Sequence, residues 1–185
     1  MTIILNYESS NKYSASKDLN IYIELYNSDK ELIYRKLFDN GLIEKDTVRI
    51  YSLDVPSDVY QDAYYALAKK YTGSETDTKT MVCKYNETIS NQELNYSIVY
   101  TFKNDGLVSY IVNKKINNYD ENSLAYKTLE KEFNSITSGA TFENGSLNYT
   151  INLDSISEDF KPLYEKDTLM TTIKNKEKLK KWECE

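Results

Sequence analysis

The sequence predicts an α+β protein, in which a small β-rich unit is followed by an antiparallel sheet packed by helices. Apolar and polar residues alternate over residues 94–103, as in a half-buried strand. The turn signals Asn104-Asp105-Gly106 and Asn144-Gly145 separate such segments. Apolar residues recur at helical spacing over residues 119–138. Helices segregated from an antiparallel sheet define the α+β class.

Composition and a polar stretch indicate two folded units. Of 185 residues, 40% are hydrophobic and 28% are charged, which is typical of a globular chain. Residues 71–80 read Tyr-Thr-Gly-Ser-Glu-Thr-Asp-Thr-Lys-Thr and are polar after the tyrosine, as in a linker. We therefore expect a β-rich unit over residues 1–72 and an α+β unit over residues 79–185.

The first unit is predicted to be a small, sandwich-like β structure. Strands are expected over residues 19–26, 32–38 and 47–55, with turns between them. The segment that follows, residues 59–71, is ambiguous: its apolar spacing fits a helix capped by Ser57, whereas Pro56 and the tyrosine-rich run fit a final strand. Periodicity leaves both alternatives open.

The second unit is predicted in the order β-β-β-α-β-β-α. Its first strand begins near Cys83, and a hairpin follows over residues 94–116. A helix over residues 119–138 precedes a second hairpin over residues 140–153. Two short helices, 156–164 and 168–182, close the chain, and Pro162 should kink or divide the first of them.

The two cysteines begin and end this second unit. A disulfide between Cys83 and Cys184 would close a loop of about 100 residues, worth up to ~4.7 kcal/mol in the chain-entropy model. Such bonds persist in oxidising compartments, which points outside the cytoplasm. A redox pair is disfavoured because the spacing is unlike Cys-x-x-Cys. The remaining alternative is a cytoplasmic protein with two free thiols.

Charge and residue usage weigh against several functions. The net charge of −6 and pI of about 4.9 argue against a nucleic-acid partner. The absence of histidine removes the commonest general base and the usual transition-metal ligand. Five glycines and no phosphate-binding motif give no cofactor site, so we expect no cofactor, no metal and no catalytic residues.

Membrane association is expected only through a segment outside these residues. No apolar stretch approaches the ~18 residues of a transmembrane helix, and no signal peptide or lipobox is visible. If the disulfide forms, an export signal or anchor is required. Location in the cell envelope is therefore predicted, with the anchor or signal absent from this sequence.

One aromatic sheet face is a candidate binding surface. Tyr96, Tyr100 and Phe102 share a face of the strand over residues 94–103, and Tyr110 lies on the partner strand. If exposed, this face would bind a glycan, a peptide or a protein. We favour the alternative, that it packs under the helix of residues 119–138, because one sheet face must be covered.

The second unit, about residues 79–185, resembles the YehR-like lipoproteins of bacteria, a family of small extracytoplasmic proteins. The resemblance covers the opening cysteine, a strand running into a turn, the helix, a later strand and a lysine-rich C-terminal helix ending in cysteine. Its quoted segments are Cys83-Lys84-Tyr85, Tyr96-Ser97-Ile98-Val99-Tyr100-Thr101-Phe102, Lys103-Asn104-Asp105-Gly106 and Leu147-Asn148-Tyr149-Thr150-Ile151-Asn152-Leu153-Asp154. It implies a lipid-anchored protein, although the family's separate N-terminal cysteine has no counterpart here.

The first unit, about residues 1–72, resembles small immunoglobulin-like domains known by an F-x-L-Y-D motif. Here the motif reads Ile23-Glu24-Leu25-Tyr26-Asn27, followed by Asp29-Lys30-Glu31-Leu32-Ile33. The resemblance implies a bacterial surface or membrane-anchored protein, and it favours a strand over a helix at residues 64–71. Neither family supplies a reaction.

These observations predict a non-catalytic extracytoplasmic module of a membrane-anchored or lipoprotein-type envelope protein. Abundant Lys, Asn, Ile and Tyr indicate an AT-rich coding genome, and hence a low-GC Gram-positive bacterium as the source. Its partner would be a protein or small ligand at the envelope. The alternatives are a small-ligand-binding lipoprotein and an envelope hydrolase that uses lysine or carboxylate residues. A deep cleft with converging lysine and carboxylate groups would favour the hydrolase, and a flat exposed tyrosine patch a protein partner.

Overall fold

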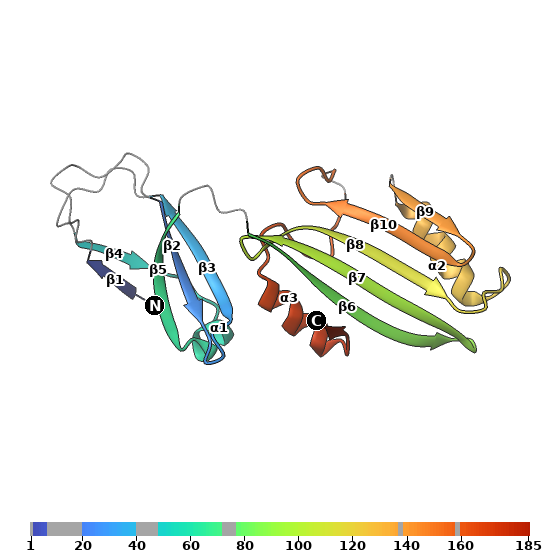
Figure 1. Cartoon of the computed structure of the whole chain (residues 1–185), viewed down its shortest axis with the longest axis horizontal. Helices are drawn as coiled ribbons and strands as arrows, with labels where there is room; N and C mark the ends of the chain where they lie inside the picture. Colours follow the sequence, from blue (N-terminus) through green and yellow to red (C-terminus); the bar gives the residue numbers. More distant parts are fainter. Residues whose placement is uncertain (1, 7–19, 40–47, 72–76, 137–138, 158–159) are drawn as a thin grey trace. The chain divides into compact units, whose positions relative to one another are not determined.

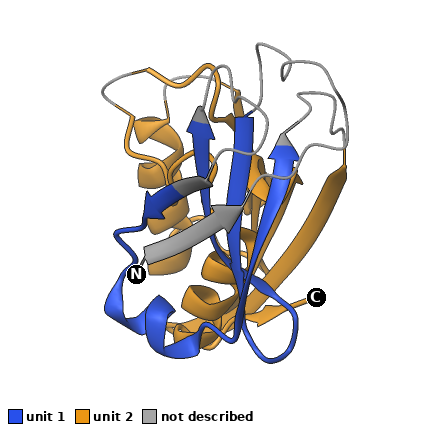
Figure 2. Ribbon diagram, turned by 90° about the vertical axis from the view of Figure 1, so that its left-hand side faces the viewer, with its two compact units in different colours: residues 1–75 blue, residues 76–185 orange. Residues whose placement is uncertain are grey.

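The computed structural model describes residues 2–6, 20–39, 48–71, 77–136, 139–157 and 160–185 (Figure 1). The chain divides into two compact units, Met1–Glu75 (unit 1) and Thr76–Glu185 (unit 2) (Figure 2). The described part is mainly antiparallel sheet with helices, which makes the protein α+β.

The described residues of unit 1 form a three-stranded and a two-stranded antiparallel sheet. The three-stranded sheet has the order β3-β2-β5, and β1 pairs with β4 in the other. The bounds are β1 Thr2–Asn6, β2 Asn20–Tyr26, β3 Leu32–Asp39, β4 Val48–Ser52, α1 Ser57–Asp62 and β5 Tyr65–Tyr71. Ile23 of β2 and Tyr51 of β4 share one buried cluster with Leu53, so side chains from both sheets form the core.

The ambiguous segment after Pro56 contains both a helix and a strand. α1 is one short helix without a buried residue, and Pro56 is its N-cap, so the expected capping by the Ser57 side chain is wrong. β5 follows and pairs with β2 along its whole length. Pairing with the central strand β2 gives hydrogen-bond partners to the peptide groups of β5 that face it, and local periodicity could not reveal this long-range pairing.

Unit 2 is a six-stranded antiparallel sheet with two helices on one face. The strand order is β11-β6-β7-β8-β10-β9. The bounds are β6 Thr78–Ile89, β7 Gln92–Lys103, β8 Gly106–Ile116, α2 Leu124–Ser135, β9 Ala140–Glu143, β10 Ser146–Asn152, α3 Met170–Leu179 and β11 Glu183–Cys184. β7 has 12 residues and so extends for about 40 Å, enough for two helices to lie along it.

The turns of unit 2 have the backbone that their residues favour. Asn144 and Gly145 both have positive φ, 50° and 69°, as a type I′ hairpin requires. A Cβ on Gly145 would also lie 2.7 Å from the Cβ of Tyr119. Glycine is therefore needed for both its backbone conformation and its packing.

Both helices cover the same sheet face, at different ends. Leu94 packs with Leu129 of α2, and further along β7 Tyr100 and Phe102 share a cluster with Ile173 of α3. These positions of β7 have even numbers, so their side chains point to one face. In Figure 1, α3 lies near β6, and α2 lies near β9 and β10. Odd-numbered positions point to the opposite face.

Several predicted boundaries of unit 2 are wrong. The proposed linker is too long, since β5 includes Tyr71 and β6 begins at Thr78. The helices over 119–138 and 168–182 shorten to α2 and α3, and the two-residue β11 has no periodicity that could predict it. No helix forms in the described part of residues 156–164, where the Leu163 amide instead donates to the Tyr110 hydroxyl at 3.1 Å.

Candidate functional site

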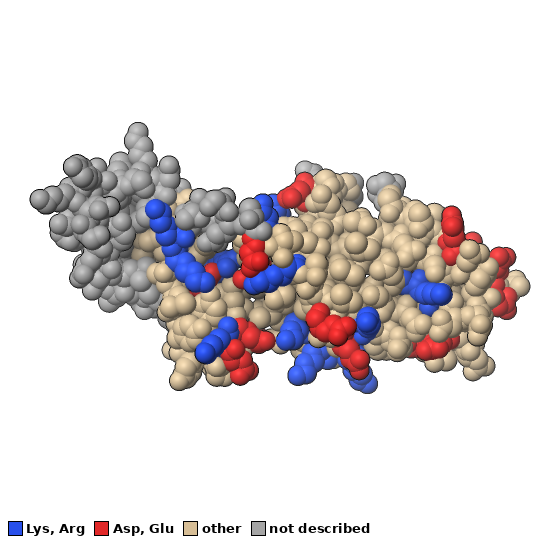
Figure 3. All heavy atoms as spheres, viewed as in Figure 1, with Lys and Arg blue, Asp and Glu red and all other residues tan. Residues whose placement is uncertain are grey.

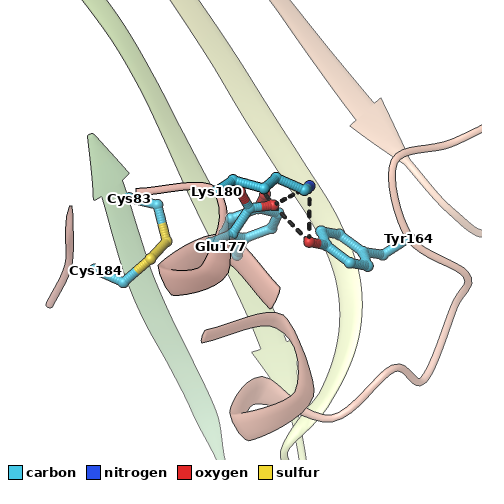
Figure 4. The surroundings of a disulfide bond; sticks show 6 residues. Cys83, Tyr164, Glu177, Lys180 and Cys184 are labelled. Carbon is cyan, nitrogen blue, oxygen red and sulfur yellow. Dashed lines mark hydrogen bonds and ion pairs between the residues drawn. A yellow bond between two sulfur atoms is a disulfide. The ribbon is translucent and has the colours of Figure 1, made fainter. Parts of the chain in front are cut away.

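The predicted disulfide is confirmed. Cys83 and Cys184 lie opposite each other in the β6–β11 pair, with a Cα–Cα distance of 4.1 Å (Figure 4). Cys83 is fully buried, and the backbones of Val82 and Glu185 exchange two hydrogen bonds of 2.9 and 3.0 Å. The bond therefore fixes the C-terminal strand to the edge of the sheet, directly after α3.

The predicted aromatic face is mostly core. Tyr100, Phe102 and Tyr110 are at most 1% exposed, and only Tyr96 is partly exposed. The expected cover, the helix of residues 119–138, is wrong for the three buried rings, because they pack with Ile173 of α3. α2 covers the other end of the sheet. This face is therefore not an exposed aromatic platform.

Glu177, a buried carboxylate on α3, accepts hydrogen bonds from two tyrosines of unit 2. The hydroxyl of Tyr100 donates to Glu177 Oε1 at 3.1 Å. The hydroxyl of Tyr164 donates to the same oxygen at 2.5 Å (Figure 4). Lys180 Nζ lies 3.3 Å from this oxygen. Burial raises the pKa of both tyrosines, followed by the charge of Glu177 for Tyr100 and by the hydrogen bond to Glu177 for Tyr164, so both hydroxyls stay neutral donors. Through these hydrogen bonds Glu177 fixes α3 to Tyr100 of the sheet and to Tyr164.

A second set of polar contacts joins α2 to the sheet. Lys114 Nζ donates to both carboxylate oxygens of Glu132, at 2.8 and 2.6 Å, and the Tyr149 hydroxyl donates to one of them at 3.2 Å. The same ammonium lies 5.3 Å from the ring centroid of Tyr96. The Tyr96 ring in turn lies 6.0 Å from that of Trp182. These groups satisfy one another on the helix-covered face.

A polar groove is lined mainly by strand residues whose side chains point to the opposite face of the same sheet. Its volume is about 500 Å³. The cross-strand register aligns its side chains in two neighbouring rows, Lys84–Ser97–Asn113 and Asn86–Asn95–Lys115. The residues that line it are Lys84, Tyr85, Asn86, Asn95, Tyr96, Ser97, Asn113, Lys115, Lys181 and Glu183. We call this the polar groove; it combines three lysines with amide and hydroxyl groups and one carboxylate.

Sequence reasoning missed the polar groove. The alternation over residues 94–103 marked Asn95 and Ser97 as the polar side of a half-buried strand, which is the usual solvated face. Their neighbours Lys84 and Asn113 come from strands whose register the sequence did not specify. The signal available was the set of uncharged amides at alternate positions of adjacent strands.

Unit 1 contains a third carboxylate that is nearly buried. Glu24 is 1% exposed, and its oxygens lie 2.6 Å from Arg35 Nη2 and 2.7 Å from Lys69 Nζ. The hydroxyl of Tyr26 donates to it at 2.5 Å. Burial raises the pKa of Glu24, but the hydrogen bonds from Lys69, Tyr26 and Arg35 outweigh it, so the net pKa is lowered. This cluster joins all three strands of the sheet.

The Glu24 cluster is expected to make unit 1 acid-sensitive. Because the folded pKa lies below the ordinary value of about 4.5, the stabilisation is complete above that value. It is lost as the pH falls through the folded pKa. Urea unfolding from pH 7 to pH 3, followed by the NMR signals of Ile23 and Leu25, measures this loss. Glu24→Gln should be less stable at pH 7 and show a smaller pH slope; equal slopes would contradict the assignment.

Neither a metal site nor a membrane-spanning helix is found in the described part of the chain. Among these residues, no three Asp, Glu or Cys side chains gather where they could hold an ion. None of the helices described above is both long and apolar enough to cross a bilayer.

Comparison with protein-family models, curated sequences and solved structures gave no significant match. Functional inference for this chain therefore rests on the chemistry of its own residues.

Proposed function

We propose that this chain is a non-catalytic, extracytoplasmic binding module of a membrane-anchored or lipoprotein-type bacterial envelope protein, and that its ligand lies in the polar groove of unit 2. The observation that carries the proposal is the groove itself, in which polar side chains of the sheet and of the turn after α3 meet, while α2 and α3 cover the other face of the sheet. A rigid scaffold that presents convergent polar groups is the usual basis of ligand recognition.

The disulfide supports the envelope location. Cys83 is a fully buried member of the core cluster of unit 2, and the bond closes a loop with a sequence separation of 101. Structural disulfides of this kind persist in secreted and envelope proteins and are rare in reducing compartments. The resemblance of unit 2 to YehR-like lipoproteins agrees with this location and belongs to the proposal.

Unit 1 is proposed as an immunoglobulin-like structural module. Its motif residues serve the fold: Glu24 and Tyr26 belong to the buried cluster, and the Asn27 side chain accepts from the amides of Asp29 and Glu31 at 3.1 and 2.9 Å. Residues that satisfy a turn and a core support a structural role for this segment.

The absence of catalysis is proposed from how the carboxylates are used. Glu177, Glu132 and Glu24 each accept hydrogen bonds from tyrosine and lysine side chains in packed surroundings. Glu183 is the carboxylate that lines the polar groove. A pair of carboxylates with separated pKa values is the usual basis of acid–base hydrolysis, and Glu183 is the single carboxylate among the described residues that line the groove. A hydrolase that uses Glu183 with the lysines of the groove is the alternative to this proposal.

Location is tested by trapping thiols in the cells that make this protein. Rapid acid quenching and alkylation, followed by intact-mass measurement, should leave Cys83 and Cys184 unmodified until a reductant is added. Alkylation of both cysteines without reductant would place the protein in a reducing compartment and overturn the envelope location.

The groove is tested by an NMR screen of the intact chain against a library of small polar fragments. We expect hits to move the backbone amide signals of Ser97 and Asn113 more than those of Ala125 and Leu129 on the helix-covered side. Fragments that move only signals elsewhere would overturn the assignment of the groove as the binding site.

A further inference from the structure

We propose that the polar groove is selective for an anionic saccharide, a hydroxyl-rich ligand that carries carboxylate or phosphate groups. This inference rests on the proposed function, because it names the ligand class of the same site. It follows from two separate properties of the lining, its charge and its unused hydrogen-bonding groups.

The charge of the groove is opposite to that of the chain. Lys84, Lys115 and Lys181 line it from three separate segments, against the single carboxylate of Glu183. The whole chain has a net charge of −6, so the basic character is local. In the view of Figure 3, carboxylates gather at the α2 end of unit 2. A local cluster of ammonium groups on an acidic protein attracts a compact anion.

The ammonium groups are available to a ligand. Within the described residues, neither Lys115 nor Lys181 forms an ion pair with a carboxylate. Lys84 lies 3.5 Å from Glu185, and both side chains are more than half exposed, so this contact is weak. Lys181 has a φ of 69° at the turn after α3, where glycine is usual. Lys181 lines the groove from this turn.

The uncharged lining matches hydroxyl groups. Asn86, Asn95, Asn113 and Ser97 line the groove, and none of their side chains forms a hydrogen bond within the described part of the chain. Each amide donates and accepts, and so does each sugar hydroxyl, so neighbouring hydroxyls can be bound in pairs. Ammonium groups supply the charge-assisted bonds that select an anion.

Other ligand classes fit less well. An apolar small molecule would find contacts at Tyr85 and Tyr96, but it would cover the amides and ammonium groups without giving them partners, which costs free energy. A groove of about 500 Å³ has the size of a small-ligand site, whereas a folded protein partner buries a much larger surface. A nucleic acid requires an extended basic footprint, which an acidic chain does not provide.

The test is an NMR and calorimetric titration of the intact chain with three oligosaccharide-sized probes. They are a glucuronate-containing tetrasaccharide, a phosphorylated maltotetraose and neutral maltotetraose. We expect at least one anionic probe to bind and to move the amide signals of Ser97 and Asn113, with maltotetraose roughly 10-fold weaker or more. The two anionic arms distinguish carboxylate from phosphate as the natural source of charge.

Variants connect binding to the groove. Lys115→Gln and Lys181→Gln should each lower the affinity for the anionic probe by roughly 5- to 20-fold. Lys127→Gln, at an exposed position of α2, is the matched control and should leave affinity within about twofold. Unchanged thermal unfolding of each variant shows that the fold is retained.

The outcomes separate this inference from the proposed function. Equal binding of maltotetraose and the anionic probes overturns the charge selectivity but keeps the groove as a binding site. Inorganic phosphate that competes at the same concentration as the anionic saccharide overturns the contribution of the hydroxyls. If neither anionic probe binds while polar fragments still move Ser97 and Asn113, the ligand class is wrong and the binding module stands. If neither the anionic probes nor the polar fragments move these signals, both the ligand class and the binding module are wrong.

Discussion

Replacing Cys83 by serine is expected to lower the free energy of unfolding of unit 2 by roughly 2–5 kcal/mol. The disulfide joins residues 101 apart, so its loss lets the unfolded chain expand, while the folded sheet changes little. Cys83 also packs with Met81 and Ile98 in the core, where a serine hydroxyl would lack a partner. Urea unfolding followed by fluorescence of Trp182, the single tryptophan, reports on unit 2 alone.

Two controls separate the cross-link from the buried hydroxyl. A variant with both Cys83→Ala and Cys184→Ala removes the bond without placing a polar group in the core, and it should retain most of the loss. Reduction of the wild-type protein should give a similar change. An unfolding midpoint that stays constant in all three experiments would refute a stabilising role for the disulfide.

Replacing Glu177 by alanine is expected to lower the free energy of unfolding of unit 2 by about 2–5 kcal/mol. The change leaves the hydroxyls of Tyr100 and Tyr164 without their acceptor in a packed region, at about 1–3 kcal/mol each. It also removes the carboxylate that fixes α3 on the sheet. Trp182 follows α3 directly, so its fluorescence is again a suitable probe of unfolding.

Matched variants test this explanation. Glu177→Gln keeps one oxygen that can accept both hydroxyls and should lose less than Glu177→Ala. Lys178 is exposed on the same helix, so the free energy of unfolding of Lys178→Ala should stay within about 0.5 kcal/mol of the wild-type value. If Glu177→Ala proves as stable as Lys178→Ala, the buried hydrogen bonds contribute nothing and α3 is held by apolar contacts alone.

Local signals predicted the hairpins of unit 2 because their information lies in few residues. Asn144-Gly145 supplies the positive φ values of its turn whatever surrounds it. The alternation that begins at Leu94 identifies which side chains of β7 are buried. The prediction of a helix over residues 156–164 was wrong because the contacts there are long-range. Leu163 and Tyr164 form hydrogen bonds to groups more than ten residues away, and these contacts replace helical ones.

The candidate site was less predictable than the fold. Tyr96, Tyr100, Phe102 and Tyr110 were correctly placed on one face, but which helix covers that face depends on where α2 and α3 dock. The polar groove depends on the register of three strands, which aligns Ser97 with Lys84 and Asn113. Register is a long-range property, and a shift of one residue would send these side chains to the other face.

By itself, the sequence determined the α+β class, the hairpin turns and the cysteine pair, because each depends on local conformation or on a chemistry that few residues possess. Tertiary structure decided that α3 rather than α2 covers the tyrosines, that residues 65–71 form β5, and that Lys84, Lys115 and Lys181 meet at one groove. These outcomes depend on burial and pairing between distant segments, whose free energy no local window of sequence contains.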